Sequence, residues 1–102
     1  MSQDLIGAAL DMLLERESYA YTALWDSLAM NQRRLLKALA SENRKVKPFS
    51  ASFVRRHGLG SASNCQRAIG ALLARDLIDR DDGSFVIVDR FFRIWVQKTQ
   101  IL

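Results

Sequence analysis

The chain has 102 residues, 49% hydrophobic and 25% charged, a composition typical of one small globular domain and not of a low-complexity chain. Its single cysteine excludes an internal disulfide, its N-terminus lacks the basic start of a signal peptide, and no apolar run approaches the roughly 20 residues that span a bilayer. We therefore expect a soluble cytoplasmic protein. The net charge of +4 is uneven, because residues 29–75 carry +9, residues 1–28 carry −4 and residues 76–102 carry −1. The basic middle favours a polyanionic partner, with a solvated basic helix surface as the alternative.

The first 28 residues are predicted to form one long helix or two consecutive helices. Apolar side chains recur at helical spacing on both sides of a charged segment at residues 15–17. They are Leu5, Ile6, Ala9, Leu10, Leu13, Leu14, Ala20, Tyr21, Leu24, Trp25 and Leu28. A helix of about 25 residues would be roughly 37 Å long, more than so small a domain needs. We expect part of this stripe to pack against a second copy or another domain, the alternative being that it folds back onto the core. Residues 1–28 are therefore assigned to a connector helix and residues 29–102 to a separate domain.

Two shorter helices are predicted next. The first covers residues 31–41, with its leucines Leu35, Leu36 and Leu39 inward and its cations Arg33, Arg34 and Lys37 outward. A basic loop over residues 43–48 follows. The second helix would be capped by Ser50 or Ser52, would end near His57, and would point Phe53 and Val54 inward.

The segment from Gly58 to Ile78 has the pattern of the turn and second helix of a helix-turn-helix. Glycines 58 and 60 suit a chain that reverses between short helices, and Ser61 is a good N-cap. One helix face is apolar: Cys65, Ala68, Ile69, Leu72 and Leu73. The opposite face is small and polar: Ser63, Asn64, Arg67, Gly70, Ala71 and Ala74. Nucleic-acid readers place their base-contacting residues on such a helix.

A β-hairpin and a last helix complete the predicted fold. Two β-compatible runs, residues 77–80 and 84–88, flank a turn at residues 81–83 that contains Asp-Gly. Asp89 can cap a helix whose apolar side carries Phe91, Phe92, Trp95 and Val96. The sequence thus predicts a mainly α winged helix-turn-helix, a three-helix core plus a hairpin wing, with an extra long N-terminal helix and a C-terminal helix.

The residues that could carry catalysis or hold a metal have simpler explanations. The only histidine, His57, is expected to be a cap or surface residue, and Cys65 a small core residue. The carboxylates of Asp79, Asp81 and Asp82 suit a solvated hairpin tip better than a cation site. There is no phosphate-binding loop and no Cys/His cluster with metal-site spacing. We expect no enzymatic activity, no cofactor and no metal.

Four segments also carry a family resemblance: residues 24–28, 31–36, 58–78 and 82–95, of which the ending Asp89-Arg90-Phe91-Phe92-Arg93-Ile94-Trp95 after a wing is the most specific. The chain resembles, over essentially its whole length, the C-terminal winged-helix domain of archaeal-type P-loop ATPases of the STAND/AAA+ kind. The resemblance implies a regulatory or nucleic-acid-binding role, and an N-terminal ATPase domain as a partner within a longer parent protein. The chain departs from that family where Ala29-Met30 replaces a usual Ser-Pro, and where Gly70 replaces a frequent lysine or polar residue.

Two functions remain open on these patterns. In double-stranded DNA binding, Ser61, Ser63, Asn64 and Arg67 would lie at the major groove, with Asn and Arg suited to adenine and guanine. Phosphates would be contacted by Arg33, Arg34, Lys45, Lys47, Arg55 and Arg56. In the alternative, the small face with Gly70 and the acidic wing would dock on the ATPase domain or another protein. The first helix would then form a homodimer.

Overall fold

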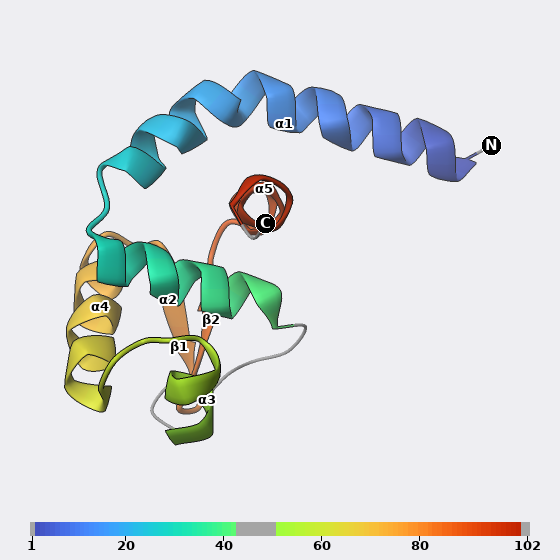
Figure 1. The fold of residues 1–102 in the computed structure, drawn as a ribbon. Helices are drawn as coiled ribbons and strands as arrows, with labels where there is room; N and C mark the ends of the chain where they lie inside the picture. The colour runs from blue at the N-terminus through green and yellow to red at the C-terminus, as the bar shows by residue number, and fades with distance from the viewer. Residues whose placement is uncertain (1, 43–50, 101–102) are drawn as a thin grey trace.

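The computed structural model describes residues 2–42 and 51–100, and it places seven elements in the predicted order (Figure 1). The helices are α1 (Ser2–Asp26), α2 (Met30–Ser41), α3 (Ala51–Arg56), α4 (Ala62–Ala74) and α5 (Arg90–Thr99). The strands are β1 (Ile78–Asp81) and β2 (Ser84–Ile87), which pair antiparallel. The predicted fold class is confirmed. Of the two caps expected for α3, Ser50 lies outside the described residues, and Ser52 lies within the helix, so it is not the cap.

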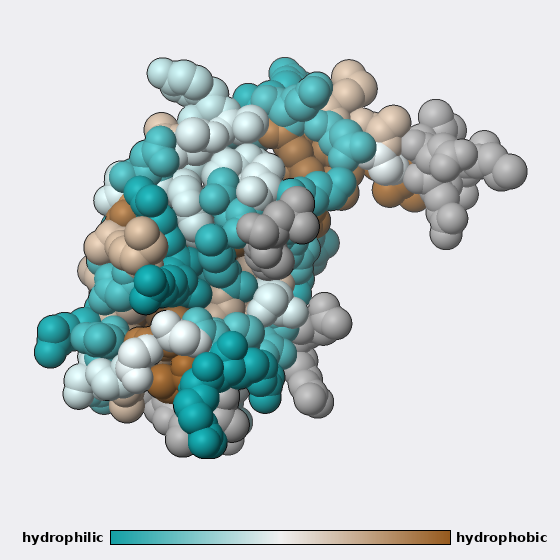
Figure 2. All heavy atoms as spheres, viewed as in Figure 1, coloured by the Kyte–Doolittle hydropathy of each residue, from teal (hydrophilic) through white to brown (hydrophobic). Residues whose placement is uncertain are grey.

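Helix α1 is one continuous helix that uses only part of its apolar surface within the chain. Leu14, Trp25 and Leu28 are buried in the core, whereas Ile6 is 68% exposed. The N-terminal half projects beyond the other elements (Figure 1), and Figure 2 shows hydrophobic side chains along this projecting part. The predicted connector therefore contributes to the core through its second half. The boundary expected between residues 28 and 29 stays a prediction.

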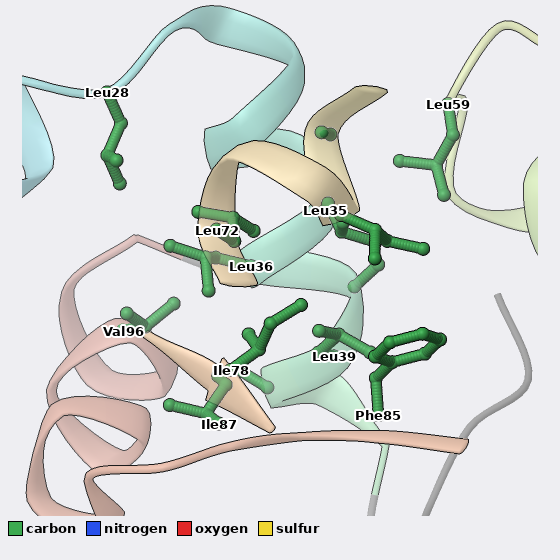
Figure 3. Close-up of a cluster of buried hydrophobic side chains, with 14 of the residues drawn as sticks. Leu28, Leu35, Leu36, Leu39, Leu59, Leu72, Ile78, Phe85, Ile87 and Val96 are labelled. Carbon is green, nitrogen blue, oxygen red and sulfur yellow. The ribbon is translucent and has the colours of Figure 1, made fainter. Parts of the chain in front are cut away.

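The core forms where α2 meets α4, α5 and the hairpin. Leu35, Leu36 and Leu39 of α2 are buried as predicted, and Figure 3 shows them beside Leu72 of α4 and Val96 of α5. The hairpin adds Ile78, Phe85 and Ile87 to the same cluster. Phe53 and Val54 of α3 are also buried, which confirms their predicted orientation.

The helix-turn-helix is built by α3 and α4. The backbone N–H of Asn64 donates to the Ser61 hydroxyl at 3.2 Å, which confirms the predicted N-cap. Gly60 has a φ of +83°, and a Cβ there would lie 3.1 Å from Nδ2 of Asn64, so the turn requires a glycine at this position. The predicted apolar face of α4 is buried, except that Leu73 is half-buried.

The wing is a tight hairpin that pairs Ile78 with Ile87 and Asp81 with Ser84. Asp82 and Gly83 form its turn with φ values of +54° and +81°, as a type I′ turn requires, so the Asp-Gly signal predicted this turn correctly.

Helix α5 begins as predicted, but one of its aromatic residues was placed wrongly. Asp89 Oδ1 accepts hydrogen bonds from the backbone N–H of Phe91 at 2.9 Å and of Phe92 at 3.3 Å, which fixes the rotation of the helix. Phe92, Trp95 and Val96 then face the core, whereas Phe91 is 41% exposed. Successive helical residues differ by about 100° in direction, so Phe91 and Phe92 cannot both point inward.

An aromatic cluster joins α1 to α5. Tyr21 lies 5.3 Å from the Phe92 ring and 5.8 Å from the Trp95 ring between centroids, and Trp25 lies 6.2 Å from Trp95. The Tyr21 hydroxyl donates to Oδ2 of Asp89 at 3.2 Å. Burial, followed by the charge of Asp89 and this hydrogen bond, raises the pKa of Tyr21 to about 12.

This pKa predicts a loss of stability at high pH. A group whose pKa is higher in the folded state stabilises the fold below its unfolded pKa, here 10.0, and loses that effect as the pH rises to about 12. We expect Tyr21→Phe to be less stable than the wild type at neutral pH, and the difference to shrink between pH 10 and pH 12. Urea unfolding of both proteins across this range measures it. A constant difference would show that Tyr21 ionises equally in both states.

Candidate nucleic-acid interface

The exposed face of α4 contains the predicted reading residues. Ser63, Asn64 and Arg67 are all exposed, and Gln66, which sequence analysis did not select, is exposed beside them. The Ser61 hydroxyl accepts the capping hydrogen bond, so its role in this structure is to start the helix. The next turns are bare: Gly70 and Ala74 are exposed and offer no polar side chain.

Arg33 does not point outward as expected. Its Nε donates to the backbone oxygen of Trp25 at 3.0 Å, and its Nη2 donates to that of Asp26 at 3.1 Å. These oxygens belong to the last turn of α1, where carbonyls lack their usual partner four residues on, although the Trp25 oxygen also accepts from the backbone N–H of Leu28 at 3.1 Å. That turn contains no basic residue of its own. Arg33 therefore links α2 to the end of α1, and these hydrogen bonds occupy its guanidinium.

Arg34, Arg55 and Arg56 keep exposed side chains, whereas Lys45 and Lys47 lie outside the described residues. Arg56 is exposed but paired, because its Nη1 lies 3.0 Å from Oε1 of Glu42.

His57 is neither a cap nor a free surface residue. Its Nε2 lies 3.2 Å from Oε1 of Glu42, and its ring lies 4.6 Å from the Phe53 ring between centroids. The hydrogen bond with His57, followed by the charge of Arg56, holds the pKa of Glu42 below its usual range. Glu42 thereby ties the end of α2 to the end of α3.

A small hollow joins α2 to the turn and to α4. It has a volume of about 80 Å³ and contains Asn31 and Arg34 from α2, Gly60 from the turn, and Asn64 from α4 among its lining residues. Asn31 is not among the site residues expected from the sequence. The three-residue spacing from Asn31 to Arg34, which places them on one side of a helix, was a signal that could have found it.

The wing is acidic where it is exposed. Asp79, Asp81 and Asp82 are all exposed, as predicted for a solvated tip, and the Arg80 guanidinium lies 5.6 Å from the centre of the Phe85 ring. Such a tip repels a phosphate backbone.

Three further features concern metal binding, the cysteine thiol and membrane insertion. Over residues 2–42 and 51–100, no three Cys, His, Asp or Glu side chains gather as a metal site would require. Cys65 is buried, and burial raises the pKa of its thiol, as expected of a core residue. None of the helices in the described part of the chain is long and apolar enough to cross a membrane.

A helix-turn-helix followed by a two-stranded wing defines a winged-helix domain, a class that commonly binds DNA. A family model described as a probable winged helix domain matches residues 19–98, and the chain belongs to this family. Neither the curated proteins nor the solved structures contained a match.

Proposed function

We propose that this domain is a non-catalytic module that binds double-stranded DNA through α4. The observation that carries the proposal is that Asn64 and Arg34 line the same hollow. A side chain suited to a base edge and a cation suited to a phosphate are thus adjacent, as groove binding by a helix-turn-helix requires.

The direct readers in this proposal are few. Asn64 can pair with adenine and Arg67 with guanine, while Ser63 can bond to either. Affinity comes from phosphate contacts by Arg34 and Arg55, and by Arg56, whose 60% exposed side chain would exchange its ion pair with Glu42 for a phosphate. Lys45 and Lys47 are further candidates. Arg33 is left out because its donors are bonded to α1.

Titrating a fluorescent random-sequence duplex at two salt concentrations tests this proposal. Binding should weaken steeply with salt. Arg55→Ala combined with Arg56→Ala should lower the salt slope, which is the slope of the logarithm of the binding constant against the logarithm of the salt concentration, by about two. The matched control is Arg16→Ala combined with Arg90→Ala, which removes the same charge from exposed positions on α1 and α5. The proposal is contradicted if no duplex binds at tens of micromolar protein in low salt. It is also contradicted if the control double variant loses as much duplex affinity as the Arg55→Ala, Arg56→Ala variant.

Gly70→Ala separates stability from groove contact. A Cβ at Gly70 would meet no described atom within 4 Å, so the change should stabilise the domain by about 1 kcal/mol through helix propensity. We expect weaker duplex binding despite this gain, because the added methyl lies on the face that approaches the groove. Urea unfolding and the duplex titration measure the two effects. Unchanged affinity would show that this turn of α4 stays away from DNA.

A second candidate function is protein docking with self-association through α1. The observation that favours it is the outer face of α1, where Met12 is 66% exposed and Tyr19 is 89% exposed. These residues are seven apart and so share one helix face. Sedimentation equilibrium should then report a dimer that Met12→Glu combined with Tyr19→Glu dissociates. A monomer at high concentration contradicts this candidate.

The proposal also places the module at the C-terminal end of a P-loop ATPase. Its support is the resemblance of the Asp89–Trp95 ending and of the three other segments to that family. A phosphate-binding loop encoded upstream in the same reading frame would agree with this placement, and its absence would contradict it.

A further inference from the structure

A second, larger hollow lies at the other end of α2, and the DNA-reading residues do not account for it. It has a volume of about 220 Å³ and is lined by Arg34, Lys37, Ala38 and Ser41 of α2, by His57 after α3, and by Gln100 at the end of α5. A water molecule occupies about 30 Å³ of the liquid, so a tetrahedral oxyanion fits with room for several waters.

The charge around this hollow is positive. The structure shows no hydrogen bond or ion pair from Arg34 or Lys37 to another described residue, and these side chains lie one helical turn apart. Next to the lining residue His57 is the Glu42 carboxylate, which is ion-paired with Arg56 at 3.0 Å and hydrogen-bonded to His57 at 3.2 Å. The Ser41 hydroxyl donates to the Ala38 oxygen at 2.8 Å, so the cations remain as the donors for an anion.

The end of α2 is also covered in a way that limits its repulsion of an anion. A helix C-terminus carries partial negative charge on its last carbonyls. Here Arg93 Nη2 donates to the backbone oxygen of Glu42 at 2.7 Å, and Gln97 Nε2 donates to the backbone oxygen of Ala40 at 2.7 Å.

We propose that this hollow binds a phosphate group, and that in the DNA complex it holds a backbone phosphate. The inference rests on the proposed function for the source of that phosphate. Arg34 lines both this hollow and the one that contains Asn64, so the two hollows adjoin at this residue of α2. The second backbone contact is thus made by α2 and not by the acidic wing.

The test combines phosphate and duplex titrations of the wild type, Lys37→Gln and a control, Arg16→Gln, which removes one charge from exposed α1. Inorganic phosphate should saturably shift the amide NMR signals of Lys37, Ser41 and His57 in the wild type and the control, and not in Lys37→Gln. Duplex affinity should fall roughly fivefold in Lys37→Gln, and the salt slope should fall by about one.

The possible outcomes distinguish failure of the phosphate site from failure of the proposed DNA binding. Duplex binding that Lys37→Gln leaves unchanged overturns this inference and leaves the proposed function standing. Saturable phosphate binding in the hollow without duplex binding overturns the backbone source, and supports a site for a free phosphorylated ligand. Phosphate shifts that are unsaturable and spread over all basic residues overturn the site itself.

Discussion

Replacing Phe92 by alanine is expected to lower the free energy of unfolding by about 3–5 kcal/mol, whereas the same change at Phe91 should cost less than about 1 kcal/mol. Phe92 is 1% exposed and its ring contacts Tyr21 and Trp95, with centroids 5.3 Å and 5.8 Å away. Removing it leaves a cavity between α1 and α5 and also removes its ring contacts. Such aromatic pairs stabilise a fold by more than the burial of their surface alone contributes.

Urea unfolding followed by circular dichroism measures both variants. The pair is well matched, because the residues are identical and adjacent in the first turn of α5. Equal losses at the two positions would show that α5 is rotated differently about its axis. A large loss at Phe91 alone would place that side chain in an interface between copies.

The adjacent arginines of α2 are expected to divide into a structural and a functional residue. Arg33→Ala should cost about 2 kcal/mol, because it removes two charge-assisted hydrogen bonds from the Trp25 and Asp26 oxygens and leaves the Trp25 oxygen with only the backbone N–H of Leu28. Arg34→Ala should leave stability within about 0.5 kcal/mol, because its side chain is exposed, and should weaken duplex binding.

Unfolding and duplex titration of the two variants test this division, with Arg33→Lys as a further control. Lysine keeps the charge but lacks the planar fork that reaches two oxygens, so most of the stability loss should remain. Full recovery in Arg33→Lys would mean that charge alone acts on the end of α1. An affinity loss in Arg33→Ala greater than that in Arg34→Ala would contradict the assignment of Arg34.

Local chemistry predicted most of the fold. The Asp-Gly turn, the Ser61 cap and the Asp89 cap depend on residues within a few positions of one another, and all three are present. The buried faces of α2 and α4 also followed from helical spacing, because a core-facing helix repeats its apolar residues every three or four positions.

The candidate site was less predictable, because the partners of its residues are distant in sequence. Arg33 bonds to carbonyls seven and eight residues away across a chain reversal, and His57 to a carboxylate fifteen residues away. The hollow beside Lys37 includes Gln100, which only the return of α5 to α2 brings near. Spacing rules within one helix contain no information about such contacts.

The sequence by itself determined the winged-helix order, the caps, the turn and the basic middle of the chain, since these follow from local backbone preference and from composition. Tertiary packing alone decided which cations remain available to a ligand. Arg33 is held by α1 and the exposed Arg56 pairs with Glu42, whereas the exposed Arg34 and the half-buried Lys37 line the hollow along α2. The physical reason is that a charged side chain takes the nearest unsatisfied partner in space, and that partner is set by how the helices pack.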